Sequence, residues 1–215
     1  MSAGSERLQI PGPAGVLEAL VESPGTAARI AAFGVICHPH PLHGGTLDNK
    51  VVYILARAFQ EVGLPTLRFN FRGVGVSEGA FDHGIGETDD TLAAVAYGRQ
   101  RWPGTTAWLA GFSFGGAVAI RAAAKAQATR LVTVSPAVSR VDLSGVELPA
   151  SPWLLVQGDA DDVVEPGEVL DWVKGLPPSH TPEVAMLAGA GHFFHGRLND
   201  LREAVVAFLR KQKPG

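Results

Sequence analysis

The sequence predicts a three-layer α/β fold, in which helices cover both faces of a mostly parallel central sheet. Short apolar runs alternate along the chain with longer stretches of helical periodicity, and this alternation is typical of parallel sheets buried on both faces. Hydrophobic residues make up 46% of the chain and charged residues 18%, which suffices for one large core. Because no repeat or break in composition divides the chain, we expect residues 1–215 to form a single domain.

In the first half of the chain, turn residues separate the apolar runs. The run at residues 33–37 leads into a segment with two prolines, which is typical of a buried strand followed by a loop. Asp48 or Asn49 could cap a helix that Gly63 ends. The remaining expected features are an apolar segment at 15–21, a strand at 65–71, a glycine-rich loop at 73–79 and a helix at 87–101.

The second half repeats the same alternation. Strands are expected at residues 106–111, 130–134, 153–157 and 183–187, and helices at 114–126, 168–175 and 198–211. Only a short segment with prolines joins residue 134 to residue 153. We therefore expect no lid domain at this point.

Composition excludes several classes of partner. The net charge of −3 gives no basic field for nucleic acid or an anionic membrane. Residues 1–7 have no apolar core, and the apolar stretch at 27–37 is too short to span a bilayer and contains Arg29. The single cysteine, Cys37, excludes an intramolecular disulfide. We therefore expect a cytoplasmic protein whose partner is a small molecule; composition does not set its oligomeric state.

The most informative motif is Gly111-Phe112-Ser113-Phe114-Gly115, which lies between an expected strand and an expected helix. In that context the motif predicts a tight, strained turn that exposes Ser113 as a nucleophile at the carboxyl edge of the sheet. A serine could instead simply cap the helix. Capping accounts for the serine but not for a glycine on each side of it.

A serine hydroxyl needs a base, and the base needs a group that orients it. Asp159, Asp161 and Asp162 follow one expected strand, and His192 and His195 follow a later one. Carboxyl ends of parallel strands lie at one edge of a sheet, where open α/β sheets bind ligands. The serine, an acid and a histidine can therefore meet there.

The chain resembles the α/β-hydrolase superfamily, and within it the small bacterial esterase-like group without a lid that is similar to dienelactone hydrolase. The matching segments are residues 37–41, 44–45, 70–77, 111–115, 158–164 and 191–192. The resemblance implies the α/β-hydrolase fold, with Asp161 as the acid of a Gly-x-x-Asp-x-x-Val pattern and His192 as the base. Asp159 and Asp162 are then turn-forming carboxylates, and His195 caps the last helix or lines the site.

The resemblance also implies an oxyanion hole made of two backbone N–H groups. Phe114 supplies one of them. For the other, the family usually has His-Gly-x, whereas this chain has His38-Pro39-His40. Because Pro41 has no N–H, His40 is the expected donor and Leu42 the fallback.

Two other interpretations of the sequence remain open. His38, His40 and His43 have the His-x-His-x-x-His spacing of dinuclear zinc hydrolases, although Leu42 stands where a carboxylate usually precedes the third histidine. These histidines could instead support loops of the site. The chain could also be a catalytically silent binding protein on a hydrolase scaffold, which the intact order of serine, acid and histidine argues against.

The sequence thus predicts a carboxylesterase-type serine hydrolase that acts through an acyl-enzyme on Ser113 and needs no metal or other cofactor. Small carboxylic esters or thioesters are the expected substrates, because no lid covers the site. Leu42 and Phe193 are the expected substrate-binding residues. The sequence does not separate esters from peptides or lactones.

Overall fold

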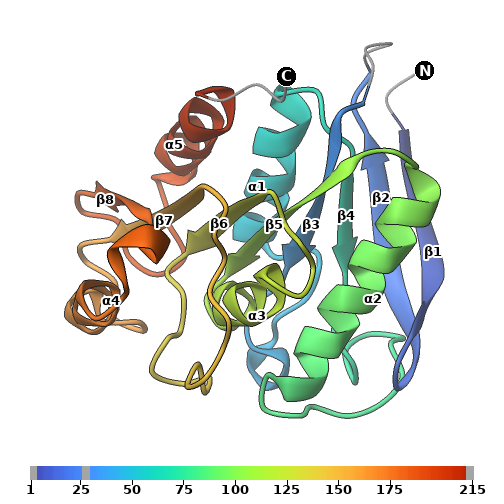
Figure 1. Cartoon of the computed structure of the whole chain (residues 1–215), viewed down its shortest axis with the longest axis horizontal. Helices are drawn as coiled ribbons and strands as arrows, with labels where there is room; N and C mark the ends of the chain where they lie inside the picture. Colours follow the sequence, from blue (N-terminus) through green and yellow to red (C-terminus); the bar gives the residue numbers. More distant parts are fainter. Residues whose placement is uncertain (1–3, 26–29, 212–215) are drawn as a thin grey trace.

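The computed structural model of the protein describes residues 4–25 and 30–211 (Figure 1). Residues 1–3, 26–29 and 212–215 lie outside this description. The expectations for the first three residues of the segment 1–7, and for Arg29 in the apolar stretch at 27–37, therefore fall outside the described residues. One eight-stranded sheet runs through the described chain, in the order β1-β2-β4-β3-β5-β6-β7-β8. The strands are β1 (Gly4–Gly12), β2 (Gly15–Ser23), β3 (Ala32–Cys37), β4 (Thr66–Phe69), β5 (Thr106–Phe112), β6 (Arg130–Val134), β7 (Trp153–Gly158) and β8 (Glu183–Leu187).

Strands β3 to β8 are parallel, as the alternation of strands and helices predicts. The first two strands form an antiparallel hairpin whose second strand, β2, also pairs antiparallel with β4. Strand β1 was not predicted. It lies at the edge of the sheet, and most of its residues are exposed, so it lacks the apolar run by which buried strands are recognised.

In the described parts of the chain, five α-helices cover the two faces of the sheet (Figure 1). Helices α1 (Lys50–Glu61) and α5 (Leu198–Arg210) pack with one another on one face. Helices α2 (Ile85–Arg101), α3 (Phe114–Ala123) and α4 (Pro166–Lys174) contribute to the core of the other face. This arrangement confirms the predicted three layers. No helix in the described part of the chain combines the length and the apolar character that crossing a membrane requires.

Strand β5 joins the two cores and places Ser113. Ala107 and Leu109 belong to the core beneath α2, α3 and α4, whereas Trp108 and Phe112 belong to the core beneath α1 and α5. Such alternation follows from the two-residue period of a strand. Because β5 lies in the middle of the sheet and is buried on both faces, the turn at its carboxyl end has a rigid support.

The connection from β6 to β7, residues 135–152, contains neither helix nor strand. Ala137, Val138 and Val141 from this connection are buried in the core on the α3 side. The connection therefore lies against the body of the protein, and the expectation that no lid domain stands at this point is confirmed.

Candidate active site

Ser113 occupies the turn between β5 and α3 with a φ of 56° and a ψ of −120°. A positive φ is strained for a residue with a side chain. The turn is held by bonds from the backbone N–H of Ser113 to the carbonyl of Val134 (2.9 Å) and from the N–H of Ala137 to the carbonyl of Ser113 (3.0 Å). The Ser113 side chain makes no capping bond to α3, which argues against the interpretation of Ser113 as a helix cap.

The glycines beside Ser113 are required by close backbone contacts. A Cβ atom on Gly111 would lie 2.1 Å from the carbonyl oxygen of Gly115. A Cβ on Gly115 would lie 2.3 Å from the carbonyl oxygen of His38 and 2.5 Å from that of Cys37. Glycine thus lets α3 begin directly against the end of β3. The start of α3 and the loop after β3 are therefore in contact.

The serine, the histidine and one aspartate are hydrogen-bonded in series. Ser113 Oγ lies 3.1 Å from His192 Nε2, and His192 Nδ1 lies 2.9 Å from Asp161 Oδ2. All three residues are at least nine-tenths buried. They come from the loops that follow β5, β8 and β7, each just beyond the carboxyl end of its strand.

The Asp161 carboxylate has further partners that hold it ionised. Burial alone would raise the pKa of Asp161, but hydrogen bonds from His192 and from the backbone N–H groups of Val163 and Val164 outweigh burial, and the pKa lies below its ordinary value. The Gln157 amide also lies 3.2 Å from Asp161 Oδ2. Sequence reasoning missed Gln157, whose only signal was its position at the end of an apolar run.

The other candidate acids and histidine lie apart from this series. Asp159 accepts a 2.6 Å hydrogen bond from the backbone N–H of Gly189, and Asp162 is exposed. His195 neither caps α5, which Arg197 precedes, nor lines the pocket; it stacks on Phe193 with ring centroids 6.0 Å apart.

His38 is fully buried, and both of its ring nitrogens bind the backbone. Nδ1 donates to the carbonyl of Pro39 (2.6 Å), and Nε2 accepts from the N–H of Phe71 (3.0 Å). Burial lowers the pKa of His38 to about 4, although the bond to Pro39 opposes this effect. His38 therefore has no free nitrogen for a metal. Within residues 4–25 and 30–211, no group of three or more His, Cys, Asp or Glu side chains is arranged as a metal site.

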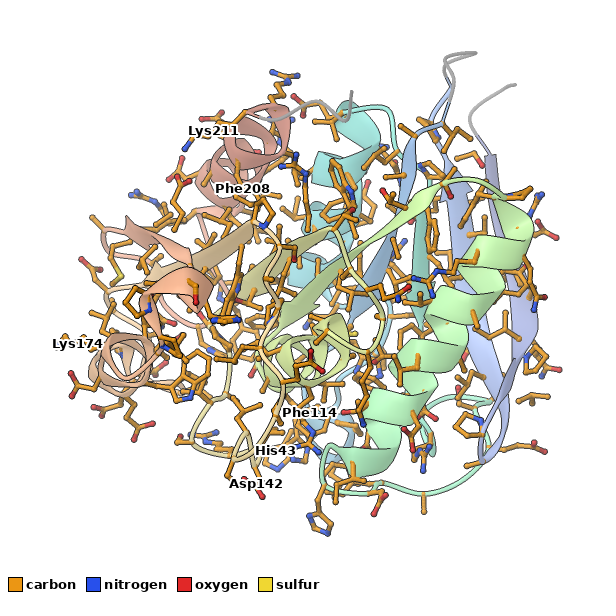
Figure 2. All side chains as sticks on the ribbon, viewed as in Figure 1. His43, Phe114, Asp142, Lys174, Phe208 and Lys211 are labelled. Atoms are coloured by element: carbon orange, nitrogen blue, oxygen red, sulfur yellow. The ribbon has the colours of Figure 1, made fainter. Side chains whose placement is uncertain are left out.

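A pocket of about 430 Å³ opens in front of Ser113. It is lined by Pro39, His40, His43, Gly44, Gly45, Asn49, Ser113, Phe114, Ala137, Arg140, Val163, His192 and Phe193. Figure 2 shows two of these residues, His43 and Phe114, at the same edge of the sheet. Sequence reasoning missed Asn49, Ala137, Arg140 and Val163, although each follows a strand or precedes a helix at this edge.

The two predicted substrate-binding residues differ in position. Phe193 is 46% exposed and lines the pocket. Leu42 is 69% exposed and does not line the pocket. The expectation for Leu42 is therefore corrected. Leu42 sits in a one-turn 3₁₀ helix, Pro41–His43, and an apolar residue type does not determine the direction that such a turn gives its side chain.

Comparisons with known proteins find sequences and structures similar to this chain. Residues 40–149 match the profile of a family described as serine aminopeptidase, S33. An uncharacterized protein of Rickettsia prowazekii is 34% identical over 187 residues, which cover 83% of this chain and 79% of that protein.

Two solved structures are similar to this chain over nearly their whole length. An α/β serine hydrolase without lid from Xanthomonas campestris is 42% identical with a TM-score of 0.93 and covers 98% of this chain and 96% of its own. An α/β serine hydrolase homologue from Coxiella burnetii is 44% identical with a TM-score of 0.89, covering 95% and 97%. The chain therefore belongs to the α/β-hydrolase superfamily, as one of its lidless serine hydrolases.

Proposed function

We propose that the protein is a carboxylesterase that cleaves small carboxylic esters or thioesters through an acyl-enzyme on Ser113. The series of hydrogen bonds from Ser113 through His192 to Asp161 carries this proposal. His192 Nε2 takes the proton of Ser113 Oγ as the oxygen attacks the carbonyl carbon, and then gives that proton to the leaving group. Asp161 holds the Nδ1–H tautomer and stabilises the imidazolium. A water molecule then attacks the acyl-enzyme by the same route.

The backbone N–H groups of Phe114 and His40 are the proposed oxyanion donors. Phe114 is the first residue of α3, where a helix provides no acceptor for the N–H. Within residues 4–25 and 30–211, neither of these two N–H groups has a hydrogen-bond acceptor. The N–H of Leu42, in contrast, donates to His40 Nδ1 at 3.2 Å. This difference favours His40 over Leu42.

The pocket favours small substrates with an apolar part. Phe114, Phe193, Ala137 and Val163 supply apolar surface beside the serine. A pocket of about 430 Å³ lies near the lower end of the volumes that small-molecule sites have. The absence of a lid between β6 and β7 leaves the site open to small esters from solution.

An aminopeptidase, the activity by which the matching family profile is described, fits this pocket less well. Recognition of a substrate α-ammonium group calls for carboxylates near the scissile bond. The described residues that line the pocket include no Asp or Glu. We therefore propose ester rather than peptide hydrolysis.

A fluorophosphonate probe tests the nucleophile. We expect one adduct on Ser113 by mass spectrometry, and loss of both the adduct and aryl-acetate hydrolysis in Ser113→Ala. Asp161→Asn should keep the fold but lower kcat by about ten-thousandfold, because the asparagine favours the wrong tautomer of His192. An intact, folded protein without an adduct on Ser113 would refute the proposal, as would hydrolysis that survives Ser113→Ala and stops with EDTA.

A further inference from the structure

The pocket in front of Ser113 is lined by cationic and neutral groups only. One guanidinium, that of Arg140, and the imidazoles of His40, His43 and His192 line it. No carboxylate occurs among the described residues that line it. A concave site with charge of one sign favours ligands of the opposite sign.

Arg140 is held at this position by the loop that carries the acid. Its Nη2 donates a hydrogen bond to the carbonyl of Val163, and the N–H of Val163 donates to Asp161 Oδ1 at 3.0 Å. Among residues 4–25 and 30–211, no carboxylate forms an ion pair with Arg140. Since a guanidinium has five N–H donors in a planar fork, donors remain for a ligand.

Three carboxylates of the segments around Arg140 have other partners. Asp161 binds His192. Glu168 accepts a 2.8 Å hydrogen bond from the Ser139 hydroxyl, and Asp142 accepts bonds from the backbone and hydroxyl of Ser144. These carboxylates do not neutralise the guanidinium by direct contact.

The positive character of the pocket also reaches His40. Partial burial is the main cause that lowers the pKa of His40, and the charges of His43, Arg140 and His83 lower it further. Every charged group that acts on His40 has the same effect, so the potential in this part of the pocket favours an anion.

We propose that Arg140 binds an anionic group of the substrate, so that the protein prefers esters that carry a second, free carboxylate, such as half-esters of small dicarboxylic acids. The inference rests on the proposed ester hydrolysis and adds the substrate class. Arg140 acts in binding: its planar fork pairs with the free carboxylate, while the ester carbonyl lies at Ser113 in the same pocket.

Two esters of matched size test this preference. Monomethyl glutarate has a free carboxylate, and methyl glutaramate has a neutral carboxamide of the same shape. Acid release at constant pH gives kcat/KM for each ester. The proteins compared are native, Arg140→Gln, Arg140→Lys and Arg121→Gln. Arg121 is the matched control because it also donates to a carbonyl of the β6–β7 connection, that of Asp142, but does not line the pocket.

We expect the native protein to favour the anionic ester by about tenfold or more, the order of magnitude for one charge-assisted hydrogen bond. The ratio of kcat/KM for the anionic ester to kcat/KM for the neutral ester should fall toward one in Arg140→Gln. It should be intermediate in Arg140→Lys and unchanged in Arg121→Gln. Raising ionic strength from about 0.01 M to about 1 M should reduce it.

Equal kcat/KM values for the two esters in native protein would overturn the inference, and this result does not depend on any variant folding. A ratio in Arg140→Gln equal to the native ratio would also overturn it. In both cases the fluorophosphonate adduct on Ser113 would remain. If that adduct and all ester hydrolysis are absent, the proposed function fails and the inference fails with it.

Discussion

His38 lies fully buried at the carboxyl end of β3, and its protonation should cost much of the protein's stability in mild acid. A proton on Nε2 would face the N–H of Phe71, which now donates to that nitrogen at 3.0 Å. Burial accordingly lowers the pKa of His38 from its ordinary value of 6.5 to about 4. In an unfolded chain the same ring would take up a proton near pH 6.5.

The sign and size of the effect follow from these two pKa values. Between pH 6.5 and about 4 the unfolded state binds more protons than the folded state, so the free energy of unfolding falls as pH falls. The contribution of neutral, buried His38 to the free energy of unfolding is fully present above pH 6.5, and it has been lost once the pH has fallen to about 4. The pKa difference of about 2.5, at about 1.4 kcal/mol for each pKa unit, corresponds to about 3 kcal/mol. That is a large fraction of the roughly 5–15 kcal/mol of a typical domain.

Urea unfolding followed by circular dichroism at pH 7 and pH 4.5 measures this contribution. Native protein should lose roughly 2 kcal/mol through His38 between these pH values. His38→Gln keeps an acceptor for Phe71 but cannot take up the proton, so its free energy of unfolding should depend less on pH. Every other residue is the same in the two proteins, so the contributions of the remaining groups cancel in the comparison. If native protein and the variant lose the same free energy between these pH values, the reasoning about His38 is wrong.

Two further predictions concern the site. Gly115→Ala should lower kcat by about a hundredfold, because the added Cβ would meet the carbonyls of His38 and Cys37 and displace the start of α3. The kinetics of aryl-acetate hydrolysis measure this change. Gly167→Ala is the control and should match native protein, because its Cβ meets no atom within 4 Å. Phe193→Ala should raise KM for aryl esters about fivefold through lost apolar contact, whereas Leu42→Ala should not; equal changes in both would contradict the positions of these two side chains.

The sequence predicts those parts of the site that depend on a local motif or on the end of a strand. The glycines at 111 and 115 are required by backbone contacts that the turn itself creates, so the motif predicts the strained serine. Strand ends at residues 158 and 187 bring an acid and a histidine to the same edge. Choosing Asp161 among three aspartates needed the family resemblance, because the choice depends on which carboxylate accepts from the backbone of Val163 and Val164.

Other features depend on tertiary packing and left no local pattern. Ile10 is the fully buried side chain of β1, and one fully buried residue in a mostly exposed segment does not predict a strand. Arg140 lies in a connection without regular structure, and its place in the pocket depends on how that connection packs against the α3 side of the sheet. Leu42 is apolar like a pocket residue, yet its 3₁₀ turn leaves it in solvent.

The contact between Gly115 and the backbone of His38 links stability to the proposed chemistry. Phe114, a proposed oxyanion donor, precedes Gly115, and His40, the other, follows His38 by two residues. Because α3 begins directly against the carbonyls of Cys37 and His38, the two donors share one rigid junction. Neutral His38 fixes this junction to Phe71 and Pro39. A proton on His38 removes the acceptor for Phe71, so acid should loosen the oxyanion donors through the same bond whose loss destabilises the fold.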